Sequence, residues 1–196
     1  MAYWKQKRRI MKQYDRSAHV YDAQYSEEQK TKIKTALTEI HFRKTDTIID
    51  VGCGTGQLLP HVSHLVSLVV CIDDSRNLIA QAQAQAEHNK QVALLRADAD
   101  HLPFRPHKFD MAFAITLLQN MPRPSQTLNE IKCITKKDAN LIITGLKKTF
   151  NQQQFTRLLR TAGLEISSLK MDEAQREYVA VCTNVKESLK RTCKAL

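Results

Sequence analysis

Apolar residues along this chain follow two different periods. Ile33, Leu37 and Ile40 recur at helical spacing, which predicts a helix over residues 26–40 with Ser26 at its N-cap. Short continuous apolar runs, such as "SLVVCI" at 67–72, predict buried strands. Strands are expected at 46–51, 67–72, 92–97, 109–115, 140–146, 164–170 and 176–183. Further helices are expected at 57–66, from Asp74 or Ser75 to Asn89, at 124–134 and at 151–163.

The order of these elements predicts an α/β fold. Strands alternate with helices and the central strands are apolar throughout, which is typical of a parallel sheet covered on both faces. The last two strands are joined by the polar stretch "MDEAQ" and are expected to form an antiparallel hairpin. We therefore expect one doubly wound domain over residues 26–196, preceded by a mobile basic segment over residues 1–25.

Composition and charge limit the classes of protein to which this chain can belong. No apolar run approaches the ~20 residues that span a bilayer, and the basic N-terminus lacks the apolar core of a signal peptide. Five cysteines occur without a CxxC pair, which favours free thiols in a reducing cytoplasm. The histidines show no metal-ligand spacing, so no metal is expected. Basic residues crowd both ends of a chain of net charge +10, which predicts either a polyanion partner or two solvated tails.

The stretch "IIDVGCGTGQL" at 48–58 carries three of the five glycines of the chain. A glycine-rich turn between a strand and a helix places bare backbone at the carboxyl edge of the sheet, where open α/β sheets bind ligands. The spacing, Asp-x-Gly-x-Gly-x-Gly, differs from the dinucleotide fingerprint GxGxxG. A carboxylate at Asp50 would repel a pyrophosphate and attract an ammonium group.

Two more carboxylates follow at neighbouring strand ends. Asp73 ends the strand "VVCID" and can accept both hydroxyls of a ribose. Asp98, in "RADADHLPF", can accept the exocyclic amine of an adenine. An amine, a ribose and an adenine without phosphate describe S-adenosylmethionine.

The four pieces "IIDVGCGTGQL", "VVCIDDS", "RADADHLPF" and "FDMAFAITLLQNM" together resemble the class I S-adenosylmethionine-dependent methyltransferases. The resemblance extends over about residues 46–146. It implies a Rossmann-like, doubly wound sheet of seven strands, mostly parallel with an antiparallel last strand. It also implies S-adenosyl-L-methionine as cofactor and S-adenosyl-L-homocysteine as product.

The resemblance also assigns a cofactor-binding set. The glycines would line the amino-acid part of the cofactor, Asp50 would position the loop or the ammonium, and Tyr21 (or Tyr14 or Tyr25) would belong to an N-terminal lid. The full set expected to bind the cofactor is Tyr21, Asp50, Gly52, Cys53, Gly54, Gly56, Asp73, Asp74, Asp98, Ala99 and Ile115. Plainer roles remain open: Asp73 could cap a helix, Asp98 could start a turn and Tyr21 could be packed core.

The resemblance implies methyl transfer by in-line displacement, for which the protein mainly aligns the reacting atoms. No catalytic residue can be assigned, because a surface position explains Asp100 and His101 equally well. The positive charge favours RNA or a ribonucleoprotein as substrate; a small molecule, or a non-catalytic cofactor-binding subunit, is the alternative. By analogy with small relatives, an activating protein subunit could add along a sheet edge.

Overall fold

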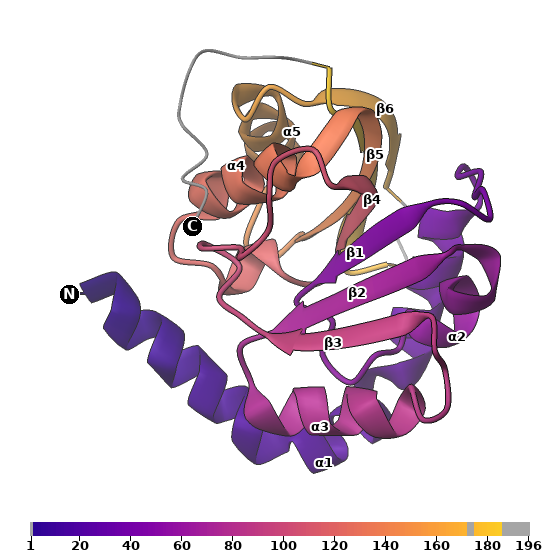
Figure 1. Ribbon diagram of the computed structural model, residues 1–196. Helices are drawn as coiled ribbons and strands as arrows, with labels where there is room; N and C mark the ends of the chain where they lie inside the picture. Colours follow the sequence, from indigo (N-terminus) through magenta and orange to yellow (C-terminus); the bar gives the residue numbers. More distant parts are fainter. Residues whose placement is uncertain (1, 172–174, 186–196) are drawn as a thin grey trace.

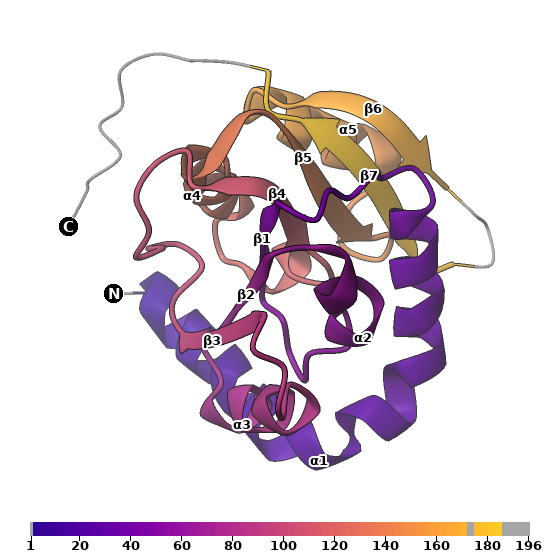
Figure 2. The same cartoon turned by 45° about the vertical axis from the view of Figure 1, so that its right-hand side comes forward.

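The computed structural model describes residues 2–171 and 175–185, without the side chains of residues 2 and 13–29. Figures 1 and 2 show a central twisted sheet flanked by helices. The strands are β1 (Thr47–Val51), β2 (Leu68–Asp73), β3 (Val92–Arg96), β4 (Phe109–Ala114), β5 (Thr135–Leu146), β6 (Glu165–Lys170) and β7 (Glu177–Thr183). The helices are α1 (Ala2–Leu37), α2 (Leu59–Val62), α3 (Arg76–Gln85), α4 (Pro124–Ile134) and α5 (Gln152–Thr161), with 3-10 turns η1 (Ser63–Leu65) and η2 (Leu118–Asn120).

The sheet has seven strands in the order β3-β2-β1-β4-β5-β7-β6. β1 pairs in parallel with β2 and β4, and β3 and β5 extend the parallel part on either side. β7 lies antiparallel between β5 and β6. The predicted doubly wound, mostly parallel sheet with an antiparallel last strand is therefore confirmed. The strand order reverses between β1 and β4, which is where such sheets bind ligands.

Two apolar cores lie on opposite faces of the sheet, because successive strand residues point to opposite sides. Ile49 and Val51 of β1 pack with α4 and α5 on one face. Ile48 packs on the other face with α2 and with Ile33 and Ala36 of α1. Figures 1 and 2 show α1 running along α3 on this second face, so that the two helical layers cover the sheet.

Polar caps and one glycine fix the ends of two helices. Ser75, one of the two predicted caps, accepts a hydrogen bond from Leu78 N at 3.2 Å and starts α3. Asn151 and Gln154 form a capping box at the start of α5. α5 ends before Gly163, whose φ of 75° suits a left-handed C-terminal position.

The predicted starts of two elements are wrong, and the helix expected to reach Asn89 ends at Gln85. The first helix begins at Ala2 and not at Ser26, because residues 1–37 contain neither glycine nor proline to end it. α1 is therefore continuous across the boundary expected at residue 25. β5 begins at Thr135 and not at 140, because backbone pairing with β4 starts within the polar stretch "TKKD". Among the described residues, no helix is both long and apolar enough to cross a membrane.

Candidate functional site

The glycine turn after β1 exposes backbone at the carboxyl edge of the sheet. Gly52 and Gly54 have φ of 77° and 56°, values that favour glycine. The N–H groups of Gly52 and Cys53 donate to Ile72 O at 2.8 and 2.9 Å, which ties the turn to β2. A Cβ at Gly54 would meet no atom within 4 Å. Gly54 therefore presents bare main chain to the space above the sheet.

Gly56, the third glycine of the turn, packs against neighbouring helices. Its φ is 87°, and a Cβ would lie 3.0 Å from Leu59 Cδ1 and 3.2 Å from Ala82 Cβ. Gly56 lines neither of the cavities described below. It allows α2 and α3 to approach the turn closely and does not face the ligand space.

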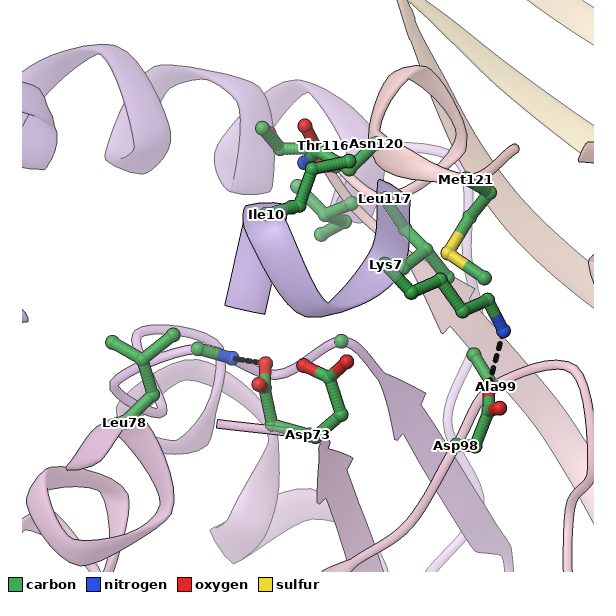
Figure 3. A pocket seen from close by; sticks show the side chains of 14 residues that line it. Lys7, Ile10, Asp73, Leu78, Asp98, Ala99, Thr116, Leu117, Asn120 and Met121 are labelled. Carbon is green, nitrogen blue, oxygen red and sulfur yellow. Dashed lines mark hydrogen bonds and ion pairs between the residues drawn. The ribbon is translucent and has the colours of Figure 1, made fainter. Parts of the chain in front are cut away.

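A cavity of about 90 Å³ opens at the ends of β1, β2, β3 and β4. Figure 3 shows its lining, with Asp73 and Asp98 on the sheet side and Thr116 and Asn120 on the loop after β4. Seven of the predicted residues line it: Gly52, Gly54, Asp73, Asp74, Asp98, Ala99 and Ile115. The other lining residues are Lys7, Ile10, Leu78, Thr116, Leu117, Asn120 and Met121, of which the last four belong to the motif "FDMAFAITLLQNM".

Asp73 joins the end of β2 to the glycine turn. Its carboxylate accepts hydrogen bonds from Gly54 N at 3.0 Å and from Ser75 N at 2.9 Å. Burial, together with the negative charges of Asp73 and Asp98, raises the pKa of neighbouring Asp74 to about 6. The carboxylates thus give the cavity a negative field that favours a cationic ligand.

A second cavity of about 50 Å³ lies behind the turn and is lined by Asp50 and Cys53 as well as Gly52. Asp50 is 4% exposed, and burial, with a contribution from Asp73, raises its pKa to about 7. A hydrogen bond with Cys71, followed by burial, raises the pKa of the Cys53 thiol well above its usual value. The Cys53 thiol stays protonated at neutral pH and is a poor nucleophile.

The loop after β4 contains a strained residue at the junction of both cavities. Thr116 has φ of 58°, which is unfavourable for a β-branched side chain. Thr116 N donates to Thr144 Oγ1 at 2.7 Å, and Thr116 Oγ1 donates to Glu177 Oε1 at 3.2 Å. Glu177 is 1% exposed and forms an ion pair of 2.9 Å with Lys32, which is 2% exposed. Strain that is held by buried partners commonly marks a functional loop.

Sequence reasoning missed the Lys32–Glu177 pair, because 145 positions separate the two residues and no local pattern joins them. Lys7 belongs to the basic N-terminal run, and its position in the cavity was not predicted. The side chain of Tyr21, the predicted lid residue, lies outside the described residues, as do those of Tyr14 and Tyr25. Its assignment stays a prediction.

A doubly wound sheet with bare backbone after β1 and carboxylates after β2 and β3 has the architecture of the Rossmann-like class, which binds its ligands at this edge of the sheet. Residues 49–143 match a family model described as "Methyltransferase domain". The chain is 25% identical over 144 residues to a malonyl-[acyl-carrier protein] O-methyltransferase of Marinomonas sp. (strain MWYL1), covering 72% of this chain and 53% of the relative. It is 30% identical over 115 residues to a demethylmenaquinone methyltransferase of Lactiplantibacillus plantarum, covering 56% of this chain and 48% of the relative. The chain thus spans about half the length of these curated relatives.

Solved structures share the fold. One, a complex of the Haloferax volcanii Trm112 methyltransferase activator with a putative methyltransferase, superposes with a TM-score of 0.78 at 17% identity, covering 88% of this chain and 98% of that one. Another, a SAM-dependent methyltransferase from Aquifex aeolicus, gives a TM-score of 0.69 at 20% identity, covering 82% and 98%. Residues 49–143 therefore match a methyltransferase domain, and the sheet has the Rossmann-like fold of the solved S-adenosylmethionine-dependent methyltransferases.

Proposed function

We propose that this protein transfers the methyl group of S-adenosylmethionine to RNA or to a ribonucleoprotein. The observation that carries the methyl-transfer part is the shared cavity of Gly54, Asp73 and Asp98, which offers bare backbone and two carboxylates to a cationic nucleoside. Asp73 would hold the ribose, Asp98 with Ala99 would hold the adenine, and Gly52, Gly54 and Ile115 would border the methionine portion. The sulfonium supplies an electrophilic methyl group when the cofactor is bound.

The residues present fit this cofactor. The cavity wall has carboxylates that would accept from hydroxyl and amine donors, and bare main chain at Gly54 against which the ligand would lie. Thr116 and Asn120 on the loop after β4 would border the acceptor atom, since this loop lies opposite the carboxylates (Figure 3). Alignment of acceptor, methyl and sulfur can supply roughly 7–11 kcal/mol of the barrier, so a general base is optional.

The surface beside the cavity supports RNA as the acceptor. Lys5, Arg8, Arg9 and Lys12 are exposed on the first turns of α1, the same turns that place Lys7 and Ile10 in the cavity. Tyr3 and Trp4 are 52% and 56% exposed. Clustered cations next to exposed aromatic rings are suited to phosphates and stacked bases.

A small-molecule acceptor is the second candidate. It is favoured by relatives whose names include a demethylmenaquinone methyltransferase and a phosphatidylethanolamine N-methyltransferase. A non-catalytic cofactor-binding subunit is the third candidate, since cofactor binding alone would preserve the same cavity.

Transfer of label from S-adenosylmethionine tests the three candidates. The purified protein is incubated with methyl-labelled cofactor and with RNA, protein and small-metabolite fractions of a cell extract. Label in RNA or in ribonucleoprotein is the expected result, and Asp73→Ala, which removes the ribose acceptor, is expected to abolish it. Label only in small metabolites would contradict the RNA proposal, and cofactor binding without label in any fraction would support the non-catalytic subunit.

We also propose a small activating protein subunit. The complex with an activator that superposes on this chain supports the idea by analogy of fold. β3 is an edge strand with no fully buried residue, and its Leu95 is 39% exposed. An apolar open edge is suited to pairing with a partner strand. Co-purification of a tagged copy from its own cells, with Leu95→Lys as the variant expected to lose the partner, tests this proposal.

A further inference from the structure

Lys7 places a positive charge inside the cavity. It is 8% exposed, whereas its helical neighbours Gln6 and Arg8 are exposed. Lys7 Nζ lies 2.5 Å from Asp98 Oδ1 and 2.5 Å from Asp100 Oδ2. Figure 3 shows the side chain extending from α1 across the cavity to Asp98.

The two carboxylates that receive Lys7 are fixed by the rest of the domain. Asp98 Oδ1 also accepts the N–H of Asp100 at 2.9 Å. Asp100 is 3% exposed, and its Oδ1 accepts the hydroxyl of Thr127 on α4 at 2.5 Å. The carboxylates therefore form a preset cation site, and the ammonium group of Lys7 occupies it.

We propose that Lys7 is an internal competitor for the adenine subsite, so that the cofactor enters only when Lys7 leaves Asp98. This inference rests on the proposed cofactor site, in which Asp98 accepts the adenine amine. An ammonium at 2.5 Å from Oδ1 takes the position that a donor amine needs. The N-terminal turns of α1 thus act as a gate that is closed in this structure.

The packing of α1 allows such a gate to open. Among the described side chains of α1, the buried apolar residues Ile33 and Ala36 lie at its C-terminal end. At the N-terminal end, Tyr3 and Trp4 are exposed, and Ile10 and Met11 are half-buried. Segments with few buried apolar contacts open at low free-energy cost. The terminal turns can therefore move while Ile33 and Ala36 keep the C-terminal end of α1 packed.

Calorimetric titration with S-adenosylhomocysteine and with adenosine tests the gate. Lys7→Met keeps the apolar stem and removes the ammonium, and we expect it to bind both ligands about tenfold more tightly than the wild type, since a charge-assisted hydrogen bond no longer has to be broken. Lys7→Arg keeps the charge and is expected to bind like the wild type. Lys34→Met makes the same change on another exposed residue of α1, outside the proposed RNA surface, and is expected to leave both affinities within about twofold.

Amine labelling of the wild-type protein gives a second readout that needs no variant. We expect S-adenosylhomocysteine to raise the reaction rate of Lys7 with an acylating reagent, measured by mass spectrometry, while the rates of exposed Lys5 and Lys12 stay constant. Unchanged or weaker ligand binding by Lys7→Met, or Lys7 labelling that the ligand does not accelerate, would overturn the gate. If neither wild type nor variant bound S-adenosylhomocysteine, the cofactor site itself would be wrong, and the gate with it.

Discussion

Gly54 and Gly56 both have positive φ, but their surroundings differ. An alanine at either position would destabilise the folded state by roughly 1–2 kcal/mol, because the backbone there is left-handed. At Gly54 the added methyl group would enter open space beside the cavity, whereas at Gly56 it would press on Ala82 and Leu59. We predict that Gly54→Ala weakens binding of S-adenosylhomocysteine with a modest loss of stability, and that Gly56→Ala loses considerably more stability.

Urea denaturation and calorimetry of the two variants check this contrast. Equal losses of stability would show that the contacts at Gly56 relax without cost. Wild-type affinity in Gly54→Ala would show that the ligand does not approach this backbone.

Asp50 makes the stability of the unliganded protein depend on pH. Its pKa is about 7 in the folded state against an ordinary value of 3.8, so the folded state holds the extra proton between these limits. The free energy of unfolding therefore falls as the pH rises from about 4 to about 7. We predict that Asp50→Asn removes this slope and is more stable than the wild type at about pH 8, by on the order of 2–4 kcal/mol.

Urea denaturation of the wild type and Asp50→Asn at several pH values measures how the free energy of unfolding of each protein changes with pH. Parallel slopes for wild type and variant would contradict the buried, protonated state of Asp50. An ammonium-bearing cofactor should favour the ionised carboxylate, so its binding is expected to release a proton near neutral pH.

At the scale of elements, the Lys32–Glu177 ion pair fastens α1 to the first residue of β7 and, through Thr116, to the loop after β4. Removing one partner leaves a buried charge, so we predict that Glu177→Ala costs about 3–5 kcal/mol of stability. The double variant Lys32→Met with Glu177→Leu is expected to recover most of this loss. The exposed pair of Lys170 and Glu39 is the control, and Glu39→Ala is expected to leave stability unchanged within error.

Chemical denaturation measures the free energy of unfolding of the wild type and of each of these variants. A double variant as unstable as Glu177→Ala would mean that the pair does not act as one unit. A small effect of Glu177→Ala alone would mean that the carboxylate reaches water once Lys32 moves.

Elements with a strong local signal were predictable. A helix was predicted at residues 124–134, where the structure has α4 with Leu128, Ile131 and Ile134 buried at helical spacing. The start of α1 was not predictable from Ser26, because a cap residue inside a run without breakers does not stop a helix. The link from Lys7 to Asp98 depends on the path of α1 across the sheet, which sequence periodicity does not encode.

At the scale of the whole molecule, topology brings the predicted carboxylates together. Asp73 and Asp98 lie in separate sequence motifs and meet because parallel strands end at one edge. The motifs therefore predicted most of the cavity wall, since each motif sits at a strand end. They did not predict Glu177, because its contribution comes from an antiparallel strand on the far side of β5.

The net charge of +10 leads to a prediction about RNA binding by the whole molecule. If phosphate contacts dominate RNA binding, the affinity for total RNA must fall steeply as salt rises. Replacing Lys5 and Arg9 by alanine is expected to lower both the affinity and the salt slope. Filter binding over a salt series measures both, and salt-independent or absent binding would contradict an RNA substrate.

Calorimetric titration of the ligand-stripped protein with S-adenosylmethionine is the most direct measurement of the central claim. The account predicts saturable heat for one cofactor per chain, weakened strongly by Asp73→Ala and retained by Lys34→Met. Absence of heat with both the cofactor and S-adenosylhomocysteine, from folded protein, would contradict it.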